Sequence, residues 1–265
     1  KPLTSHSFGI DDTVIAYSKL NDISSLGILL EYDKSELKDI TKSTIELHRS
    51  NSFKEHKGNI AFIGGGNYSS RVLIPAFKKA GANLITLITS GGISAFHHGK
   101  KNGFNLASTD IEEAFTESID AVVIATQHNL HKDQAIQALG ELKHVFVEKP
   151  LALNHSEIDE IETAQKASGS IVMVGYNRRF APHIQKIKKL LEKKSSPKTF
   201  IMTMSAGKIP KEHWTQDIKV GGGRIIGEAC HYIDLMRFLA GSKIKTFDAV
   251  KMGENSFIEL TEDKA

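Results

Sequence analysis

Cysteine and tryptophan are scarce in this chain of 265 residues, which contains one of each, Cys230 and Trp214. A single cysteine excludes a disulfide within the chain and suits a reducing compartment, so we expect a cytoplasmic protein. No apolar run approaches the ~20 residues with which a helix crosses a bilayer. Residues 1–12 lack the apolar core of a signal peptide. The sequence therefore predicts neither secretion nor a membrane partner.

Charge of one sign is not in large excess either, since 34 basic and 31 acidic residues leave a net charge of +3. The densest basic stretch, KIKKLLEKK at 186–194, has the spacing of an amphipathic helix with Ile184, Ile187, Leu190 and Leu191 facing inward. Its lysines are then the solvated face of that helix. Nothing in this pattern predicts a nucleic acid partner.

Residues 1–57 differ from the rest of the chain because they contain few apolar residues. GILLEY at 27–32 predicts a short buried strand, and the polar run RSNSFKEHKG at 49–58 predicts a linker. A segment of this size with so little apolar surface would not bury a core of its own. We therefore expect it to pack on a larger unit.

Residues 58–177 alternate apolar strands with helices. The expected strands are 59–64, 84–89, 121–126, 144–148 and 171–176, and the expected helices are 69–80, 94–103, a short one capped by Asp110, one that ends at Leu139, and 156–167. Strands that are nearly all apolar and alternate with helices indicate a parallel sheet covered on both faces. The pattern predicts an α/β fold, a Rossmann domain with a doubly wound parallel sheet.

After Arg178 the pattern changes to that of an α+β domain with a largely antiparallel sheet. We expect strands at 199–205, 246–250 and 256–260 and a helix at 227–240. Because the chain stops soon after the last of these strands, we expect the sheet to be incomplete and the parent protein to continue. We also expect a homo-oligomer that associates through this sheet.

The glycine-rich stretch GGGNYS at 64–69 lies between the first strand and the first helix of the predicted Rossmann domain. Gly64 allows a tight turn, Gly66 lets the backbone approach a pyrophosphate, and the helix that follows offers free N–H groups to the phosphates. Asn67 and Tyr68 complete this loop. The loop predicts dinucleotide binding, with the glycine-rich turn of a methyltransferase as the alternative.

The choice between NAD and NADP stays open. A carboxylate at the end of the second strand commonly binds the ribose 2′-hydroxyl of NAD. Here that position reads Thr89 and Ser90, followed by two glycines, with neither an acid nor an arginine. Hydroxyl and amide groups of this kind can accept a 2′-phosphate or tolerate either cofactor.

Four stretches in this order carry a family resemblance: ATQHNLH (125–131), EKPLAL (148–153), VGYNRRFAP (174–182) and GGGRIIGEACHYIDL (221–235). Over 59–243 the chain resembles the glucose–fructose oxidoreductase and inositol dehydrogenase (Gfo/Idh/MocA) family. The resemblance implies an NAD- or NADP-dependent oxidoreductase that acts on a carbinol carbon of a sugar, a sugar nucleotide or a cyclitol, in a role such as surface-polysaccharide biosynthesis. The Glu-Lys-Pro motif argues against a methyltransferase.

The same resemblance implies that Lys149 and His231 are the catalytic residues. With the glycine loop and the end of the second strand, it places the cofactor against Gly64, Gly66, Asn67, Tyr68, Ser90, Thr126, Gln127, His131, Glu148, Lys149 and Arg178, and the substrate against Arg179 and His231. His213 and Trp214 lie in a predicted loop and are further substrate candidates, because a loop tryptophan can stack on a sugar or uracil face; packing of Trp214 is the alternative. Alcohol oxidation needs a base for the proton, and a histidine with an ordinary pKa of about 6.5 can serve. A nearby lysine stabilises developing alkoxide charge. No metal is expected.

The chain departs from the family pattern four residues before the histidine, where an aspartate is usual and Gly227 stands here. Glu228 does not replace it, because one residue turns a helix by about 100°. We expect Gly227 to leave room for a water or a larger substrate, and Asp234, one turn after His231, to be a candidate for orienting the imidazole. Cys230 is expected to be buried and unreactive. A catalytically silent dinucleotide-binding or scaffold protein remains the alternative.

A second resemblance concerns residues 1–57. SHSFGIDDTVIAYSKL (5–20), followed by GILLEY, resembles the carboxyl-terminal tail of a zinc-type medium-chain alcohol dehydrogenase. This implies that the chain is a piece of a bacterial fusion protein that joins such an enzyme to a member of the first family. The tail carries none of that enzyme's zinc ligands, so no zinc is predicted.

Overall fold

The computed structural model describes residues 3–31, 42–48, 58–205, 207–252 and 255–262. Contacts divide the chain into two units, Lys1–Ile45 and Glu46–Ala265. The linker predicted at 49–58 lies outside the described residues except for its last glycine. The domain boundaries predicted after residues 57 and 177 stay predictions.

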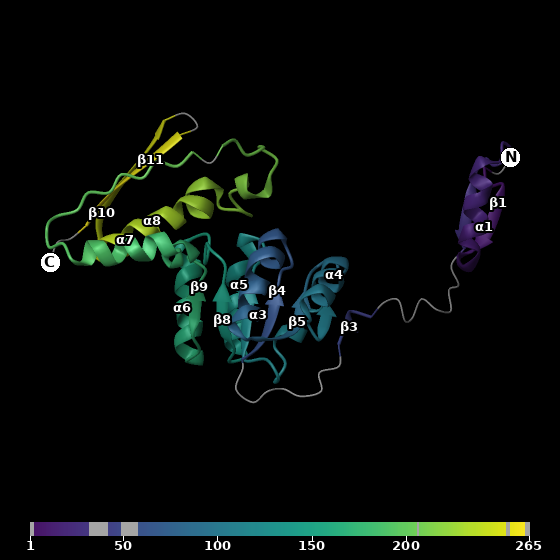
Figure 1. The fold of residues 1–265 in the computed structure, drawn as a ribbon, viewed down its shortest axis with the longest axis horizontal. Coiled ribbons are helices and arrows are strands. Elements are labelled where there is room, and N and C mark those ends of the chain that lie inside the picture. The colour runs from purple at the N-terminus through teal and green to yellow at the C-terminus, as the bar shows by residue number, and fades with distance from the viewer. Residues whose placement is uncertain (1–2, 32–41, 49–57, 206, 253–254, 263–265) are drawn as a thin grey trace. The chain divides into compact units, whose positions relative to one another are not determined.

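The first unit is a small parallel pair of strands with short helices between them (Figure 1). Its elements are β1 (His6–Gly9), η1 (Ile10–Asp12), α1 (Thr13–Ser18), η2 (Lys19–Asn21) and β2 (Ile28–Glu31). The predicted strand at 27–32 is confirmed as β2, but it is not buried, since Leu29 is 49% exposed. Ala16 is the one buried hydrophobic residue among those described here. So few residues cannot enclose a core.

The second unit contains a seven-stranded sheet in the order β3-β6-β5-β4-β7-β8-β9. Its strands are β3 (Thr44–Glu46), in which the two units meet along the chain, β4 (Asn59–Ile63), β5 (Asn83–Ile88), β6 (Leu106–Ser108), β7 (Ala121–Ile124), β8 (His144–Val147) and β9 (Val172–Val174). The strands from β4 to β9 pair in parallel. The order runs outward from β4 in both directions, which confirms the doubly wound Rossmann fold.

The helices predicted between these strands are present (Figure 1). They are η3 (Ser69–Leu73) with α3 (Ile74–Ala80), α4 (Ile93–Asn102), η4 (Ile111–Ala114), η5 (His128–Leu130) with α5 (His131–Gly140), and α6 (His155–Ser168). Gly81 ends α3 in the left-handed conformation, with φ of 93°. The predicted cap is confirmed, because the Asp110 carboxylate accepts a hydrogen bond from the backbone N–H of Glu112.

The core of this unit lies on both faces of the sheet. Successive residues of β4 point to opposite faces, so Ala61 and Ile63 join one buried cluster while Ile60 and Phe62 join the other. This explains why the strands are almost wholly apolar. In a sheet of this kind the carboxyl ends of the strands meet at one edge, next to the point where the strand order reverses. The candidate site is found at that edge.

The remaining elements of the second unit are helical, followed by one hairpin. They are η6 (Asn177–Phe180), α7 (Pro182–Glu192), η7 (Trp214–Gln216), η8 (Ile225–Ala229), α8 (Cys230–Ala240), and the antiparallel strands β10 (Ile244–Met252) and β11 (Asn255–Glu262). The two strands expected near the end of the chain are thus confirmed. No helix in the described part of the chain is long and apolar enough to span a bilayer.

Two expectations for this region are wrong. Residues 199–205 do not form a strand. Among the described residues, β10 and β11 pair only with each other, so the polar–apolar alternation at 199–205 has no strand beside it with which to form a ladder. On α7, Ile187 is 42% and Leu190 57% exposed, although helical spacing predicted both to face inward.

Candidate functional site

The glycine loop after β4 has the geometry that a phosphate group needs. Gly64 has φ of 106°, and a Cβ there would lie 2.4 Å from the carbonyl oxygen of Ala125, so only glycine fits. Gly66 is exposed, and a Cβ there would meet nothing within 4 Å. The loop thus packs closely against the end of β7 on one side and is open on the other, where the predicted pyrophosphate would approach.

Three residues after Gly66, Ser69 is buried and its hydroxyl finds no partner in the described part of the chain. Asn67 is exposed, and Tyr68 is partly exposed beside it. The Tyr68 hydroxyl accepts a hydrogen bond from Asn177 Nδ2 at 2.5 Å. Burial, with the nearby Glu148 carboxylate adding to it, raises the pKa of Tyr68. Tyr68 therefore stays a neutral phenol at this edge.

The end of β5 is the place predicted to distinguish NAD from NADP. Thr89 is buried and its hydroxyl accepts a hydrogen bond from Ser94. Ser90 is exposed, and the neighbouring Gly91 has open space around it. The structure therefore leaves room for a ribose substituent but offers no side-chain charge from Ser90 to select one.

The loop after β7 is held from within. Thr126 donates its hydroxyl hydrogen to Gln134 on α5, and Gln127 is exposed. His131 has no exposed surface, and its two ring nitrogens face the carbonyl oxygens of Pro150 at 2.7 Å and Thr126 at 3.2 Å. Burial lowers its pKa. The cofactor contact expected of His131 is thus not available in this structure, because the ring joins two loops inside the protein.

His128 lies in the same loop and reaches across to the glycine-rich turn before α8. Its Nδ1 lies 2.8 Å from the carbonyl oxygen of Gly221, so Nδ1 carries the hydrogen. The ring meets Trp214 edge to face, with centroids 4.8 Å apart. Burial, with smaller contributions from the charges of His131 and Lys149, lowers the pKa of His128 to about 4. The imidazole is therefore neutral at physiological pH.

Lys149, the second residue after β8, points toward the turn that leads into α8. Its ammonium group donates a hydrogen bond to the carbonyl oxygen of Gly227 at 2.7 Å. The preceding Glu148 is buried, and its Oε1 has no partner among the described residues. Burial raises the pKa of Glu148 to about 7. Gly175 makes this burial possible, because a Cβ there would lie 2.5 Å from Glu148 Oε1.

His231 lies in the first turn of α8, within reach of the charges of Lys149 and Arg178. It is 9% exposed, and its Nδ1 has no hydrogen-bond partner in the described part of the chain. Burial, then the charges of Lys149 and Arg178, lowers its pKa to about 4, while Asp234 acts in the opposite direction. The imidazole is therefore a neutral base at physiological pH. The structure thus brings the two predicted catalytic residues together.

Asp234 does not orient that imidazole, contrary to one sequence-based expectation. Its carboxylate accepts hydrogen bonds from both Nε and Nη2 of Arg179. This pairing occupies the carboxylate and also holds Arg179, a predicted substrate residue, against α8. Arg178 is exposed instead, donates a hydrogen bond to the Tyr232 hydroxyl at 3.0 Å, and lies over that ring.

The space expected beside Gly227 is filled. A Cβ on Gly227 would lie 3.0 Å from the carbonyl oxygen of Gly221 and 3.2 Å from Cε1 of His128. The expectation of room for a water or a larger substrate is therefore wrong, because His128 fills that side of the turn. Glu228 points elsewhere and pairs with Arg224 at 3.0 Å, one helical turn away.

The remaining predicted residues lie nearby. His213 is exposed, and its Nδ1 accepts a hydrogen bond from the Thr215 backbone at the start of η7. Trp214 is half-buried against His128. Burial raises the pKa of the half-buried Cys230 to about 11, so its thiol is protonated and unreactive as expected. The described residues contain no cluster of three His, Cys, Asp or Glu side chains that could hold a metal ion.

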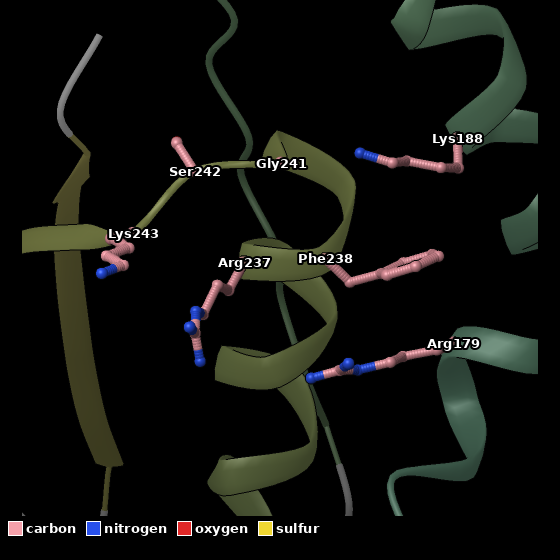
Figure 2. A pocket seen from close by; sticks show the side chains of 7 residues that line it. All are labelled: Arg179, Lys188, Arg237, Phe238, Gly241, Ser242 and Lys243. Carbon is pink, nitrogen blue, oxygen red and sulfur yellow. The ribbon is translucent and has the colours of Figure 1, made fainter. Parts of the chain in front are cut away.

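A separate cavity of about 490 Å³ lies at the other end of α8 (Figure 2). It is lined by Arg179, Lys188, Arg237, Phe238, Gly241, Ser242 and Lys243. The Arg179 guanidinium and the Lys188 ammonium both lie against the Phe238 ring, at 5.7 and 5.5 Å from its centre. Arg237 and Lys243 are exposed to water. The arrangement accounts for these cations without a ligand.

Several contacts at the site could not be found in the sequence pattern. Asn177 bonds to Tyr68 across 109 residues, and Arg178 bonds to Tyr232 across 54. His128 and Gly227, which also lie side by side, come from different segments far apart in the sequence. No local spacing encodes such pairs, because they depend on how the loop after β7 meets the turn before α8.

Comparison with known proteins gives a family match and several relatives. Residues 58–176 match the model of the Gfo/Idh/MocA family, described as an oxidoreductase family with an NAD-binding Rossmann fold. The chain is 29% identical over 147 residues to myo-inositol 2-dehydrogenase of Thermotoga maritima, covering 55% of this chain and 44% of that protein. It is 30% identical over 197 residues to the NAD⁺-dependent scyllo-inositol 2-dehydrogenase of Bacillus subtilis, covering 72% and 56%.

Solved structures agree with the fold. Levoglucosan dehydrogenase, in a complex with NADH and levoglucosan, superposes with a TM-score of 0.64 at 26% identity and covers 74% of this chain and 57% of that one. A probable dehydrogenase from Thermotoga maritima gives a TM-score of 0.61 at 25% identity, covering 72% and 57%. The chain spans about half the length of the relatives that it matches. Residues 58–176 thus match the Gfo/Idh/MocA family of oxidoreductases, whose model describes an NAD-binding Rossmann fold.

Proposed function

We propose that the protein transfers a hydride between NAD or NADP and a carbinol carbon of a sugar, a sugar nucleotide or a cyclitol. The observation that carries this proposal is the convergence of Lys149 and His231 at the carboxyl edge of the sheet. Burial and then the Lys149 charge lower the pKa of His231, and its buried Nδ1 has no hydrogen-bond partner among the described residues. A cation beside a neutral base is the pair that alcohol oxidation needs.

The chain fits a dinucleotide in this structure. Gly66 leaves open space at the loop, and the hydroxyl of the nearby Ser69 has no partner in the part of the chain that the structure describes. Glu148 likewise has a buried oxygen without a partner there. Buried polar atoms normally have partners, so these orphans are natural contacts for a bound group. Gly64, Gly66, Ser69 and Glu148 would hold the cofactor, with Thr126 and Arg178 nearby.

The bound nicotinamide supplies the hydride chemistry, and the residues of this chain handle the proton and the charge. His231, neutral at physiological pH, accepts the hydroxyl proton of the substrate during oxidation and returns it during reduction. The Lys149 ammonium stabilises the negative charge that develops on the same oxygen. Its bond to Gly227 holds the amine at that place.

The substrate class rests on the relatives. Their names include inositol dehydrogenases, and levoglucosan dehydrogenase has been solved with levoglucosan. All of these substrates present several hydroxyl groups on a ring, which supports a polyhydroxylated ring here. Trp214 beside His128 offers an aromatic wall for such a ring. A role in surface-polysaccharide biosynthesis, a homo-oligomeric state and a cytoplasmic location stay predictions.

A catalytically silent dinucleotide-binding protein is the second candidate. The observation that favours it is that Asp234, the candidate partner of His231, pairs with Arg179 instead. Turnover separates the two functions. A protein that binds cofactor but oxidises none of a panel of inositols, anhydrosugars and sugar nucleotides, with NAD⁺ or NADP⁺ as the hydride acceptor, would favour the silent protein.

Cofactor binding gives the direct test, because Trp214 is the single tryptophan and lies at the site. Energy transfer from Trp214 to the nicotinamide of NADH or NADPH reports binding. We expect both to bind, with discrimination below about tenfold, or ~1.4 kcal/mol. Gly66→Glu is the control and should weaken binding of both cofactors. Its side chain has open space, so the protein should fold, but it places a negative charge near the pyrophosphate. A folded protein that bound neither cofactor would overturn the proposal.

We further propose that residues 1–45 belong to a larger unit, as the resemblance to a medium-chain alcohol dehydrogenase implies. The exposed surfaces of Leu20, Ile23 and Leu26 support this, at 62%, 102% and 75%. Apolar side chains so exposed in one small segment are typical of a surface that another part of a protein covers. The mass of the intact natural protein tests this, because a mass equal to that of the present chain would contradict it.

A further inference from the structure

We propose that His128 is a positioning residue that sets the place of Lys149 by holding the turn whose Gly227 carbonyl accepts the lysine's hydrogen bond. His128 touches no reacting atom in this scheme. It acts through two backbone oxygens, those of Gly221 and Gly227. The proposal rests on the proposed function, since it concerns the lysine that stabilises the alkoxide.

The first step is the anchor of Lys149. The hydrogen bond of this ammonium group goes to the carbonyl oxygen of Gly227, a backbone atom. A backbone carbonyl moves only when its turn moves. Gly227 lies in the π-helical turn η8, directly before α8. The position of this turn therefore determines where the lysine amine is held.

The second step is what holds the turn. His128 Nδ1 donates to Gly221 O at 2.8 Å, and the next residue, Asn129, donates its backbone N–H to Val220 O at 3.1 Å. These two bonds tie the loop after β7 to the glycine-rich turn. The Trp214 ring packs edge to face against the imidazole. His128 is 7% exposed, so these contacts are made in a site nearly closed to water.

The third step is the fit between His128 and Gly227. A Cβ on residue 227 would lie 3.2 Å from the imidazole and 3.0 Å from Gly221 O. The ring therefore fills the volume that any larger residue at 227 would occupy. An imidazole at 128 and a glycine at 227 are complementary, and together they bring the carbonyl of Gly227 within reach of Lys149.

The neutral state of the ring suits this role. Burial and the nearby Lys149 charge keep the pKa of His128 at about 4, so Nδ1 keeps one hydrogen and Nε2 carries none. A fixed tautomer gives one constant donor to Gly221. No change in the anchor is then expected across physiological pH.

The experiment measures the Lys149 amine itself and needs no substrate. The folded chain is treated briefly with an acetylating reagent, and mass spectrometry of its peptides gives the rate at Lys149 relative to Lys143 and Lys166 in the same sample. Loss of one hydrogen bond should raise the relative rate roughly two- to tenfold. His128→Gln and Gly227→Ala are both expected to do so.

His128→Asn is the matched variant. Its side-chain amide nitrogen can take the place of Nδ1 and donate to Gly221, whereas the amide of glutamine lies one carbon further out. We expect Asn to keep the Lys149 rate closer to that of the natural protein than Gln does. His97→Ala, on an exposed histidine of α4, is the control and should change nothing. The thermal midpoint of each variant shows that it is folded.

The double variant His128→Ala/Gly227→Ala tests the complementarity. If the two residues share one volume, Gly227→Ala should raise the Lys149 rate less in a His128→Ala protein than in the natural one, although the contact of its Cβ with Gly221 O remains, and the effects should not be additive. An unchanged Lys149 rate in both His128→Gln and Gly227→Ala, or strictly additive effects, would overturn the proposal. Its failure is distinct from that of the proposed function, which Trp214–NADH energy transfer and turnover report separately.

Discussion

The ammonium group of Lys149 lies 2.7 Å from the carbonyl oxygen of Gly227, four residues before His231 in the chain. This bond connects the edge of the Rossmann sheet to the helix that carries the candidate base. It also places a cation beside an imidazole whose pKa is lowered to about 4. The predictions below concern the residues on either side of this bond.

Lys149→Ala should reduce turnover by at least about a hundredfold, because the alkoxide loses its electrostatic partner. Cofactor affinity should stay nearly unchanged, as measured by energy transfer from Trp214. Lys143→Ala is the control, since that amine donates to the Thr116 carbonyl away from the site. Full turnover in Lys149→Ala would show that this lysine is structural.

The pH dependence of turnover should reflect the low pKa of His231. With an ordinary histidine as the base, turnover would fall as the pH drops below about 6.5. A pKa of about 4 keeps the His231 imidazole neutral and active at considerably lower pH. We expect the acidic limb below about pH 5. His231→Ala should lower turnover by roughly two to four orders of magnitude. Glu228→Gln should have little effect, because that carboxylate pairs with Arg224.

A second outcome is a turnover that falls below about pH 6.5 in the natural protein, with this fall absent in His231→Ala. That result would confirm His231 as the base but contradict the lowering of its pKa by burial. If His231→Ala kept the turnover and the pH profile of the natural protein, His231 would not be the catalytic base.

Gly227→Asp should not restore a family-like carboxylate. Its Cβ would meet Gly221 and His128 at 3.0 and 3.2 Å, so the turn must shift. Overpacking of this kind costs about 1–3 kcal/mol of unfolding free energy. Urea unfolding measures it. Glu228→Ala, on the neighbouring residue but half exposed, is the comparison and should cost less. A Gly227→Asp protein as stable as the natural one and more active would contradict the close packing.

Glu148→Gln should stabilise the cofactor-free protein at neutral and alkaline pH. Burial raises the pKa of Glu148 from 4.5 in the unfolded chain to about 7. The folded state thus disfavours the charged carboxylate, and the natural protein loses stability as the pH rises from 4.5 to 7, by up to about 3 kcal/mol. Glutamine carries no charge and escapes this loss.

The difference in unfolding free energy between Glu148→Gln and the natural protein should therefore be small at pH 4.5, grow up to pH 7 and stay constant above it. Urea unfolding across this range measures it, and the histidines cancel because both proteins contain them. A difference that is independent of pH would mean that Glu148 is not desolvated.

Ser90→Asp should shift cofactor preference toward NAD. Ser90 is exposed at the end of β5, so an aspartate fits there and can accept from a ribose 2′-hydroxyl while repelling a 2′-phosphate. We expect NADPH affinity to fall at least about tenfold relative to NADH, or ~1.4 kcal/mol. Ser94→Asp, in the following helix, is the control. An equal loss for both cofactors would mean that Ser90 does not face the ribose.

Local patterns alone predicted much of the fold. The apolar strands of residues 58–177 and the glycines that end helices were sufficient for a doubly wound sheet, because both depend on neighbours along the chain. The strand at 199–205 failed for the same reason. Alternation shows only that a segment could pair, and pairing needs a second strand that no described residues provide.

The sequence by itself determined the Rossmann fold, the glycine loop and the identity of Lys149 and His231 as candidates. Only the tertiary structure decided their surroundings: Asp234 bound to Arg179, His131 sealed inside, and His128 against Gly227. The physical reason is distance along the chain. Helix and strand periods act over a few residues, whereas burial, pKa and close packing depend on segments that meet only after folding.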